Sequence, residues 1–155
     1  MQDNQMRLQT CCLIGPEVLP RQALADLTPQ LYRAMGRMIV RHGVCRFCST
    51  MGDGFDLLAA QAVLHMRGGH PQVQLVLYGE PGAAPLWQKI RLQAEQVVKA
   101  PRAQGLLCPM QMLEQSAFCL ACRQGGGHAV RRTAHAARQQ GLHVVSLTRR
   151  PSWLL

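Results

Sequence analysis

Three glycine-containing turns hold the residue types and spacings in this sequence that could do chemistry. Gly15 ends one apolar run, Gly52 and Gly54 follow a second, and residues 125–127 precede His128 after a third. Glycine lets main-chain N–H groups approach a phosphate closely, and a following helix N-terminus adds a favourable dipole. Tight turns need glycine in any case, so the signal lies in the repetition of the turn. Two such turns at matching positions predict a pocket for an anion or a nucleotide.

Two aspartates accompany the second turn. Asp56 stands where a helix is expected to begin, and its carboxylate could cap that helix or accept a hydrogen bond from a ribose hydroxyl. Capping is the commoner role of aspartate at a helix start. Asp53 lies inside the turn, where it would repel a phosphate unless it points to solvent or meets a sugar. The turn is therefore open to both a structural and a ligand-binding interpretation.

The seven cysteines are interpreted as reduced thiols, because their number is odd and no secretory signal precedes them. Residues 45–48 and 119–122 are both Cys-x-x-Cys, a spacing that often binds zinc. Both pairs fall inside expected strands, where positions i and i+3 point to opposite faces. Buried core cysteine is the favoured interpretation, and neither a metal nor a cofactor is predicted. Cys108, in an expected loop, is predicted to be the most reactive thiol.

The composition is basic, with 17 Lys plus Arg against 8 Asp plus Glu and a net charge of +9. This charge is compatible with anionic partners. The basic residues are scattered in runs of two at most, and the chain has only three Phe, two Tyr and two Trp, few for stacking bases. Nucleic acid is accordingly the least favoured partner. No apolar stretch is long enough to span a membrane, and a cytoplasmic protein is expected.

Short apolar runs alternate with helical patterns along the chain. Strands are predicted at 10–14, 44–50, 73–78, 97–98, 117–122 and 142–147, and helices at 27–42, 56–66, 87–96, 110–114 and 129–140. This alternation is typical of βαβ units. It predicts one three-layer α/β/α Rossmann-like domain over 1–155, with its core at about 10–148 and a mostly parallel sheet. Ligands of such sheets bind beyond the carboxyl ends of the strands, where the glycine turns would lie.

The order of residues 10–15, 47–64 and 125–145 resembles the SLOG superfamily, and the YpsA-like branch most of all. The superfamily also contains the DNA-processing Smf/DprA proteins and the LOG, or lysine-decarboxylase-like, enzymes. The middle block is the most specific part, with Asp56, Ala59 and Ala60 at matching positions. The resemblance implies a Rossmann-like fold, a nucleotide-type ligand at strand-end loops and self-association into a homo-oligomer. The biochemical role of the YpsA-like branch is poorly defined.

Several motif residues depart from the family pattern. Residues 15–18 read Gly-Pro-Glu-Val where the YpsA-like branch has Gly-His-Arg-Pro, so the basic pair is missing. Gln61 replaces an acidic residue that could act as a general base, and residues 125–127 replace a Gly-Gly-Thr turn. The LOG pattern also pairs an arginine with a glutamate near the phosphate turn, and the sequence does not reveal that pair. These departures favour binding over catalysis.

The first hypothesis is therefore a domain that binds a nucleotide or nucleotide derivative through strand-end turns. The residues predicted to form the site are Gly15, Gly52, Gly54, Asp56, Gly125, Gly126 and His128. The alternatives are a nucleoside monophosphate glycosidase like the LOG enzymes, disfavoured by Gln61, and a nucleic-acid-binding protein like Smf/DprA, disfavoured by the scattered arginines. The identity of the ligand and the oligomeric state stay open.

Overall fold

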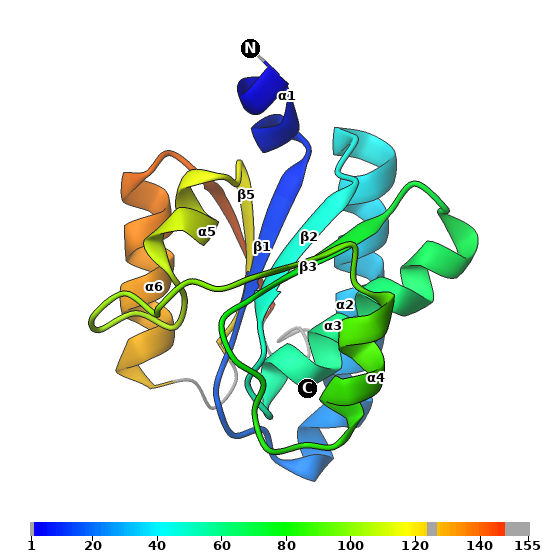
Figure 1. Cartoon of the computed structure of the whole chain (residues 1–155), viewed down its shortest axis with the longest axis vertical. Helices are drawn as coiled ribbons and strands as arrows, with labels where there is room; N and C mark the ends of the chain where they lie inside the picture. Colours follow the sequence, from blue (N-terminus) through cyan, green and yellow to red (C-terminus); the bar gives the residue numbers. More distant parts are fainter. Residues whose placement is uncertain (1, 124–126, 148–155) are drawn as a thin grey trace, which may run out of the picture.

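The computed structural model describes residues 2–123 and 127–147, which fold around a parallel β-sheet (Figure 1). The six described strands lie in the order β4-β3-β2-β1-β5-β6, and every neighbouring pair is parallel. The strands are β1 (Thr10–Ile14), β2 (Arg46–Thr50), β3 (Gln74–Tyr78), β4 (Gln96–Val98), β5 (Phe118–Cys122) and β6 (His143–Leu147). The helices are α1 (Gln2–Leu8), α2 (Arg21–His42), α3 (Phe55–Gly69), α4 (Leu86–Gln93), α5 (Met110–Glu114) and α6 (His128–Gln139).

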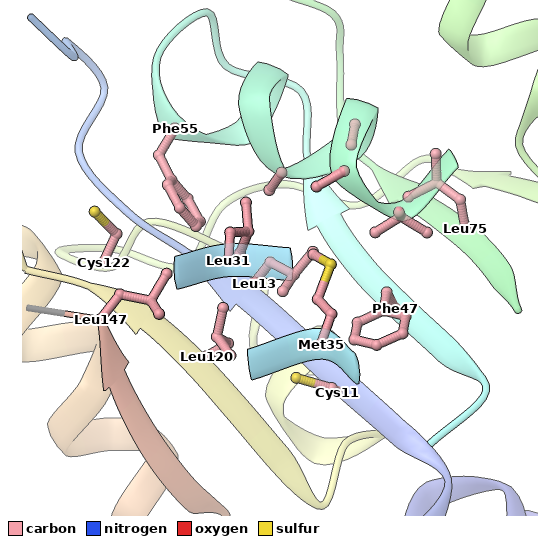
Figure 2. Packing of buried hydrophobic residues seen from close by; sticks show 14 of the residues in the cluster. Cys11, Leu13, Leu31, Met35, Phe47, Phe55, Leu75, Leu120, Cys122 and Leu147 are labelled. Carbon is pink, nitrogen blue, oxygen red and sulfur yellow. The ribbon is translucent and has the colours of Figure 1, made fainter. Parts of the chain in front are cut away.

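The helices cover both faces of the sheet. Helices α2, α3 and α4 pack on one face, and α5 and α6 pack on the other (Figure 1). The larger core lies under α2, where Leu31 and Met35 contact the strand side chains Leu13 and Phe47 (Figure 2). The predicted three-layer α/β/α fold is confirmed, because alternating apolar strands and amphipathic helices bury their apolar sides against one another.

The predicted elements agree with the structure in kind, and the largest difference in a boundary is at the start of α2. Helix α2 begins at Arg21, six residues before the expected start at 27, and it continues through Pro29. Helix α1 was not expected, because its seven residues are too few to display a helical period. None of the described helices is long and apolar enough to cross a membrane.

The order of the strands reverses between β1 and β5. From β1 the chain builds outward to β2, β3 and β4, whereas β5 continues to β6 on the other side. In open α/β sheets such a reversal creates a crevice beyond the carboxyl ends of the two central strands. The carboxyl ends of β1, β2 and β5 lie at this edge, as the sequence predicted.

Most of the cysteines lie in the core, as predicted. Cys12 pairs in register with Cys48 on one side and with Cys119 on the other, and all three are at most 1% exposed. Cys119 and Cys122 belong to cores on opposite faces of the sheet. Among the described residues, no group of three His, Cys, Asp or Glu could hold a metal ion.

The prediction for Cys108 is wrong. Its side chain is 0% exposed, and burial raises the pKa of the thiol well above its usual value. The segment before α5 folds back onto the sheet, so that a residue without regular secondary structure lies inside the core. A buried thiol that stays protonated is a poor nucleophile.

Candidate functional site

The loops after β1 and β2 pack directly against each other at the carboxyl edge of the sheet. The Phe55 N–H donates to the Pro16 carbonyl oxygen at 3.0 Å. A Cβ on Gly54 would meet main-chain atoms of Pro16 and Glu17, and a Cβ on Gly15 would meet the Phe55 side chain. Because Gly15 and Gly54 have no side chains, the two loops can pack this closely.

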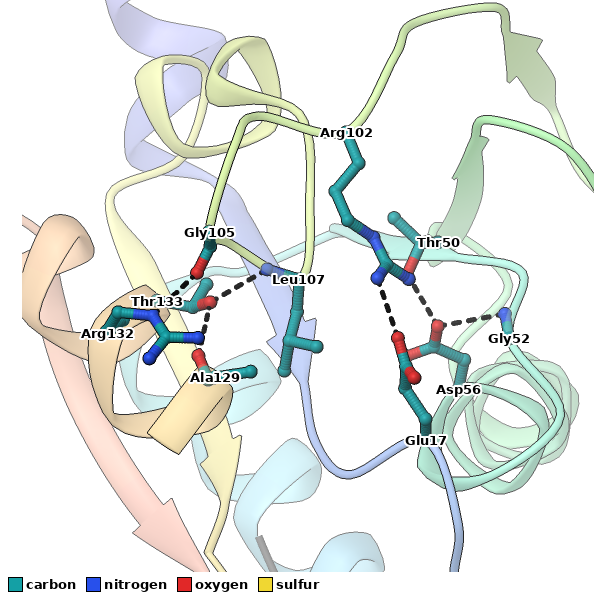
Figure 3. Close-up of polar contacts among 10 residues, drawn as sticks. All are labelled: Glu17, Thr50, Gly52, Asp56, Arg102, Gly105, Leu107, Ala129, Arg132 and Thr133. Carbon is teal, nitrogen blue, oxygen red and sulfur yellow. Dashed lines mark hydrogen bonds and ion pairs between the residues drawn. The ribbon is translucent and has the colours of Figure 1, made fainter. Parts of the chain in front are cut away.

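Asp56 closes the second turn from within (Figure 3). Its Oδ2 accepts hydrogen bonds from Thr50 Oγ1 at 2.5 Å and from the Gly52 N–H at 3.0 Å. Burial raises the pKa of Asp56 to about 6, although these two hydrogen bonds and the nearby charge of Arg102 act in the opposite direction. The carboxylate occupies the place where the turn would hold an external anion, and the Gly52 amide is already engaged.

Asp53 has a similar structural role in the same turn. Its carboxylate accepts from the main-chain N–H groups of Ala83 at 2.7 Å and Ala84 at 2.9 Å. These two bonds hold the pKa of Asp53 below its usual value. Gly82 lies so close that a Cβ there would touch the carboxylate. Asp53 thus fixes the loop before α4 while its side chain stays exposed to solvent.

An irregular segment, residues 99–109, runs across this edge of the sheet and is called the crossing segment below. Arg102 Nη1 lies 2.6 Å from Glu17 Oε1 in the loop after β1. On the other side, Arg132 Nε of α6 donates to the Gly105 oxygen at 2.9 Å, and the Leu107 N–H donates to Thr133 Oγ1 at 2.9 Å (Figure 3). The crossing segment is therefore tied both to the β1 loop and to α6.

The crossing segment nearly fills the crevice between the first two turns. The remaining cavity measures about 10 Å³, and its lining includes Gly15, Gly52, Gly54, Asp56, Arg102 and Leu107. A volume of this size holds about one water molecule. Four of the predicted site residues are thus brought together as expected, around a space too small for a nucleotide.

Two larger hollows flank the filled crevice. One, of about 440 Å³, lies at the switch point between the β1 loop and the first turn of α6. Arg102 and Arg132 line it, together with Gly127 and Ala129. The other, of about 620 Å³, lies beyond β2, β3 and β4, and its lining includes Lys99 and Glu80. Both volumes are in the range of ordinary small-molecule sites.

The third predicted turn is only partly described by the structure. Gly125 and Gly126 lie outside the described residues. His128 begins α6 and is exposed, and it does not line the 440 Å³ hollow. The N-cap residue of α6 is Gly127, which has no side chain to cap the helix. Among the described residues, no side chain caps the N-terminus of α6 where it faces the hollow.

Sequence reasoning missed Glu17, Arg102 and Arg132. Glu17 and Arg102 are 85 positions apart and meet only because the crossing segment folds over the β1 loop. The one local signal was an acidic residue directly after a glycine turn. Neither arginine belongs to a motif, so no spacing in the sequence marked them.

The comparisons with known proteins do not identify a family. No protein-family model matches the chain, and no curated protein matches it. A solved structure, described as the crystal structure of muconate lactonizing enzyme from Mucobacterium Smegmatis, is similar at 11% identity with a TM-score of 0.35. The alignment covers 93% of this chain and 49% of that chain, so the present chain spans about half of that protein.

Proposed function

We propose that the protein binds a nucleotide or nucleotide derivative in the 440 Å³ hollow at the switch point, with the phosphate between α6 and the crossing segment. The observation that carries this proposal is the placement of Arg102, Arg132 and the first turn of α6 around one hollow. An uncapped helix N-terminus and arginine side chains both favour phosphate oxygens.

The proposal moves the phosphate away from the second glycine turn. That turn already holds an internal anion, because the Gly52 amide and the Thr50 hydroxyl both donate to Asp56. A phosphate there would have to displace a carboxylate and would meet its charge. At the α6 side, no acidic residue lies in the first turn of the helix. Glu17 also lines this hollow, but it is exposed and paired with Arg102, so Arg102 and Arg132 together leave an excess of positive charge that favours the α6 side.

A calorimetric titration tests the proposal with AMP, ADP, adenosine and inorganic phosphate. The phosphate-bearing ligands are expected to bind saturably, and adenosine more weakly. The Arg132→Gln variant should weaken AMP binding about tenfold, the usual effect of losing one charge-assisted hydrogen bond. Arg37→Gln, an exposed arginine on α2, is the matched control and should bind as the unaltered protein does. The absence of saturable binding of any nucleotide would refute the proposal.

A nucleoside monophosphate glycosidase is the second candidate, and one observation favours it. Asp56 is a carboxyl group with its pKa raised to about 6, next to the pair formed by Glu17 and Arg102. Such a group can exchange a proton near neutral pH. Chromatography of nucleoside monophosphates after incubation would detect a released base. Release that persists in the Asp56→Asn variant would rule out this role for Asp56.

A further inference from the structure

Another hollow, of about 690 Å³, lies away from the loops discussed above, on the face of the sheet that α5 and α6 cover only in part. Side chains of α1, α5 and the strands β1 to β4 line it. Helix α1 stands at the end of the sheet where β1 begins, opposite the glycine turns (Figure 1). This hollow shares no lining residue with the 440 Å³ hollow.

Two arginines line this hollow, Arg7 on α1 and Arg46 on β2, and Arg46 is the one placed by the sheet. As the first residue of β2 it is held in place by its main-chain N–H, which donates to the Gln9 oxygen at 3.1 Å. Its Nη1 lies 3.0 Å from the sulfur of Met6, and a thioether is a weak acceptor. Its Nε is buried without a hydrogen-bond partner. Within the part of the chain that the structure describes, Arg46 belongs to no ion pair.

A guanidinium group in this situation is unusual. Roughly nine in ten buried polar groups in folded proteins have a hydrogen-bond partner. An unpaired group loses its hydration without compensation. A charged donor loses more than a neutral one. A carboxylate compensates a guanidinium for its lost hydration, because the two groups form short, charge-assisted hydrogen bonds. Arg46 lines the hollow without an acidic partner among the described residues, which favours a carboxylate that comes from outside the chain.

The rest of the lining complements a peptide-like molecule. Glu114 on α5 supplies a carboxylate that forms no ion pair among the described residues. Gln96 and Gln111 supply amide side chains, which both donate and accept. The Tyr78 hydroxyl donates to Gln115 Oε1 at 2.7 Å, so its lone pairs can accept another hydrogen bond. Amide and hydroxyl groups of this kind match the N–H and C=O groups of peptide bonds.

We propose that this hollow binds a short zwitterionic peptide or peptide-like molecule, whose carboxylate pairs with Arg46 and whose ammonium group pairs with Glu114. The volume of about 690 Å³ suits a molecule of a few residues. The proposal is independent of nucleotide binding, because the two hollows have no residue in common.

The test is a titration of the full chain with triglycine, followed by calorimetry and by the ¹H–¹⁵N resonance of Arg46 Nε. Triglycine is expected to bind saturably and to shift this resonance. Triglycine amide, which lacks the carboxylate, should bind about tenfold more weakly or worse. N-acetyl-triglycine, which lacks the ammonium group, should also bind more weakly, and the Glu114→Gln variant should remove that difference.

Two variants separate a site from a general effect of charge. Arg46→Met should abolish the preference for triglycine over its amide, whereas Arg37→Met, an exposed arginine on the other face of the sheet, should retain it. The Arg46→Met variant is expected to fold, because it loses a buried donor that has no partner. Three results would overturn the proposal: no saturable binding up to about 10 mM triglycine, equal affinity for triglycine and its amide, or unchanged discrimination in Arg46→Met.

Discussion

The carboxyl edge of the sheet and the hollow beside α1 differ in how their polar groups are satisfied. At the carboxyl edge, Asp56, Asp53 and Glu17 each have partners within the chain. In the α1 hollow, the buried Nε of Arg46 has none. The first region has the glycines that suggest a phosphate site in the sequence, and its crevice is nearly closed. The second region has no sequence motif, and it contains a buried donor without a hydrogen-bond partner.

The comparison shows that a glycine turn and an unpaired buried donor differ as indicators of a ligand site. A glycine turn indicates only that main-chain atoms come close, and here the atoms that approach Gly54 belong to the neighbouring loop. A buried donor without a partner lowers stability unless some other group accepts a hydrogen bond from it. The second feature is visible only in the folded structure. Gly54→Ala at the carboxyl edge and Arg46→Met in the α1 hollow should therefore change stability in opposite directions.

The largest effect is expected for Gly54→Ala. A Cβ there would lie 2.5 Å from the Pro16 oxygen and close to main-chain atoms of Glu17, which cannot move as a flexible side chain would. We expect the free energy of unfolding to fall by about 2–3 kcal/mol, the upper part of the usual range for overpacking. Denaturant titration measures it. Gly68→Ala, in α3 with no atom within 4 Å of the added Cβ, is the control and should be neutral or stabilising. Equal losses in both variants would contradict the packing role of Gly54.

Asp56→Asn should have the next largest effect, and it depends on pH. In the native state the pKa of Asp56 is about 6 against an ordinary value of 3.8, so the native protein binds more protons than the unfolded chain between these values. Stability therefore falls as pH rises through this window, by about 2–3 kcal/mol. The asparagine variant can still accept from Thr50 and Gly52, and it should be more stable than the unaltered protein at pH 7.

Denaturant titrations of both proteins at pH 4 and pH 7 measure this difference. The gain from Asp56→Asn is expected to be large at pH 7 and close to zero at pH 4, where the native aspartic acid is already protonated. A gain that is the same at both pH values would show that burial does not raise the pKa of Asp56. The Asp53→Asn variant is a useful contrast, because main-chain N–H groups lower the pKa of Asp53 and its carboxylate is stabilising.

The sequence predicted the sheet well because strand formation depends on local apolar content. The five residues of β1 and of β5 are apolar apart from Thr10, and helices follow at regular intervals. The course of the crossing segment could not be predicted, because it is fixed by single long-range contacts. One of these joins Arg102 to Glu17, and another joins Arg132 to Gly105.

The candidate sites were less accessible to sequence reasoning. The convergence of Gly15, Gly52 and Gly54 was predicted, since loops after neighbouring parallel strands lie at one edge. The use of these glycines for loop packing was not, because it depends on the side chain of Phe55 and the main chain of Pro16. A buried donor without a partner, such as Arg46 Nε, leaves no trace in the local sequence.

The effect of Arg46→Met on stability is expected to be opposite in sign to that of Gly54→Ala and smaller. The substitution removes a buried N–H donor without a partner and leaves an apolar chain of similar length. We expect the free energy of unfolding to rise by about 1 kcal/mol, the lower end for an unsatisfied buried group. Thermal unfolding without any ligand measures the gain. A loss of stability instead would indicate that Arg46 is satisfied in solution, and the contrast between the two regions would then disappear.

Arg102→Gln should have the smallest effect on stability, since the pair it forms with Glu17 is exposed. The side chains are 50% and 59% exposed, and exposed ion pairs contribute at most about 1 kcal/mol. Salt screens this contribution further, so the difference from the unaltered protein should shrink at high ionic strength in denaturant titrations. Arg102 also lines the 440 Å³ hollow, so the same variant is expected to lose nucleotide affinity. Weaker nucleotide binding with nearly unchanged stability would show that Arg102 contacts the ligand. A large loss of stability would show instead that Arg102 mainly holds the crossing segment against the β1 loop.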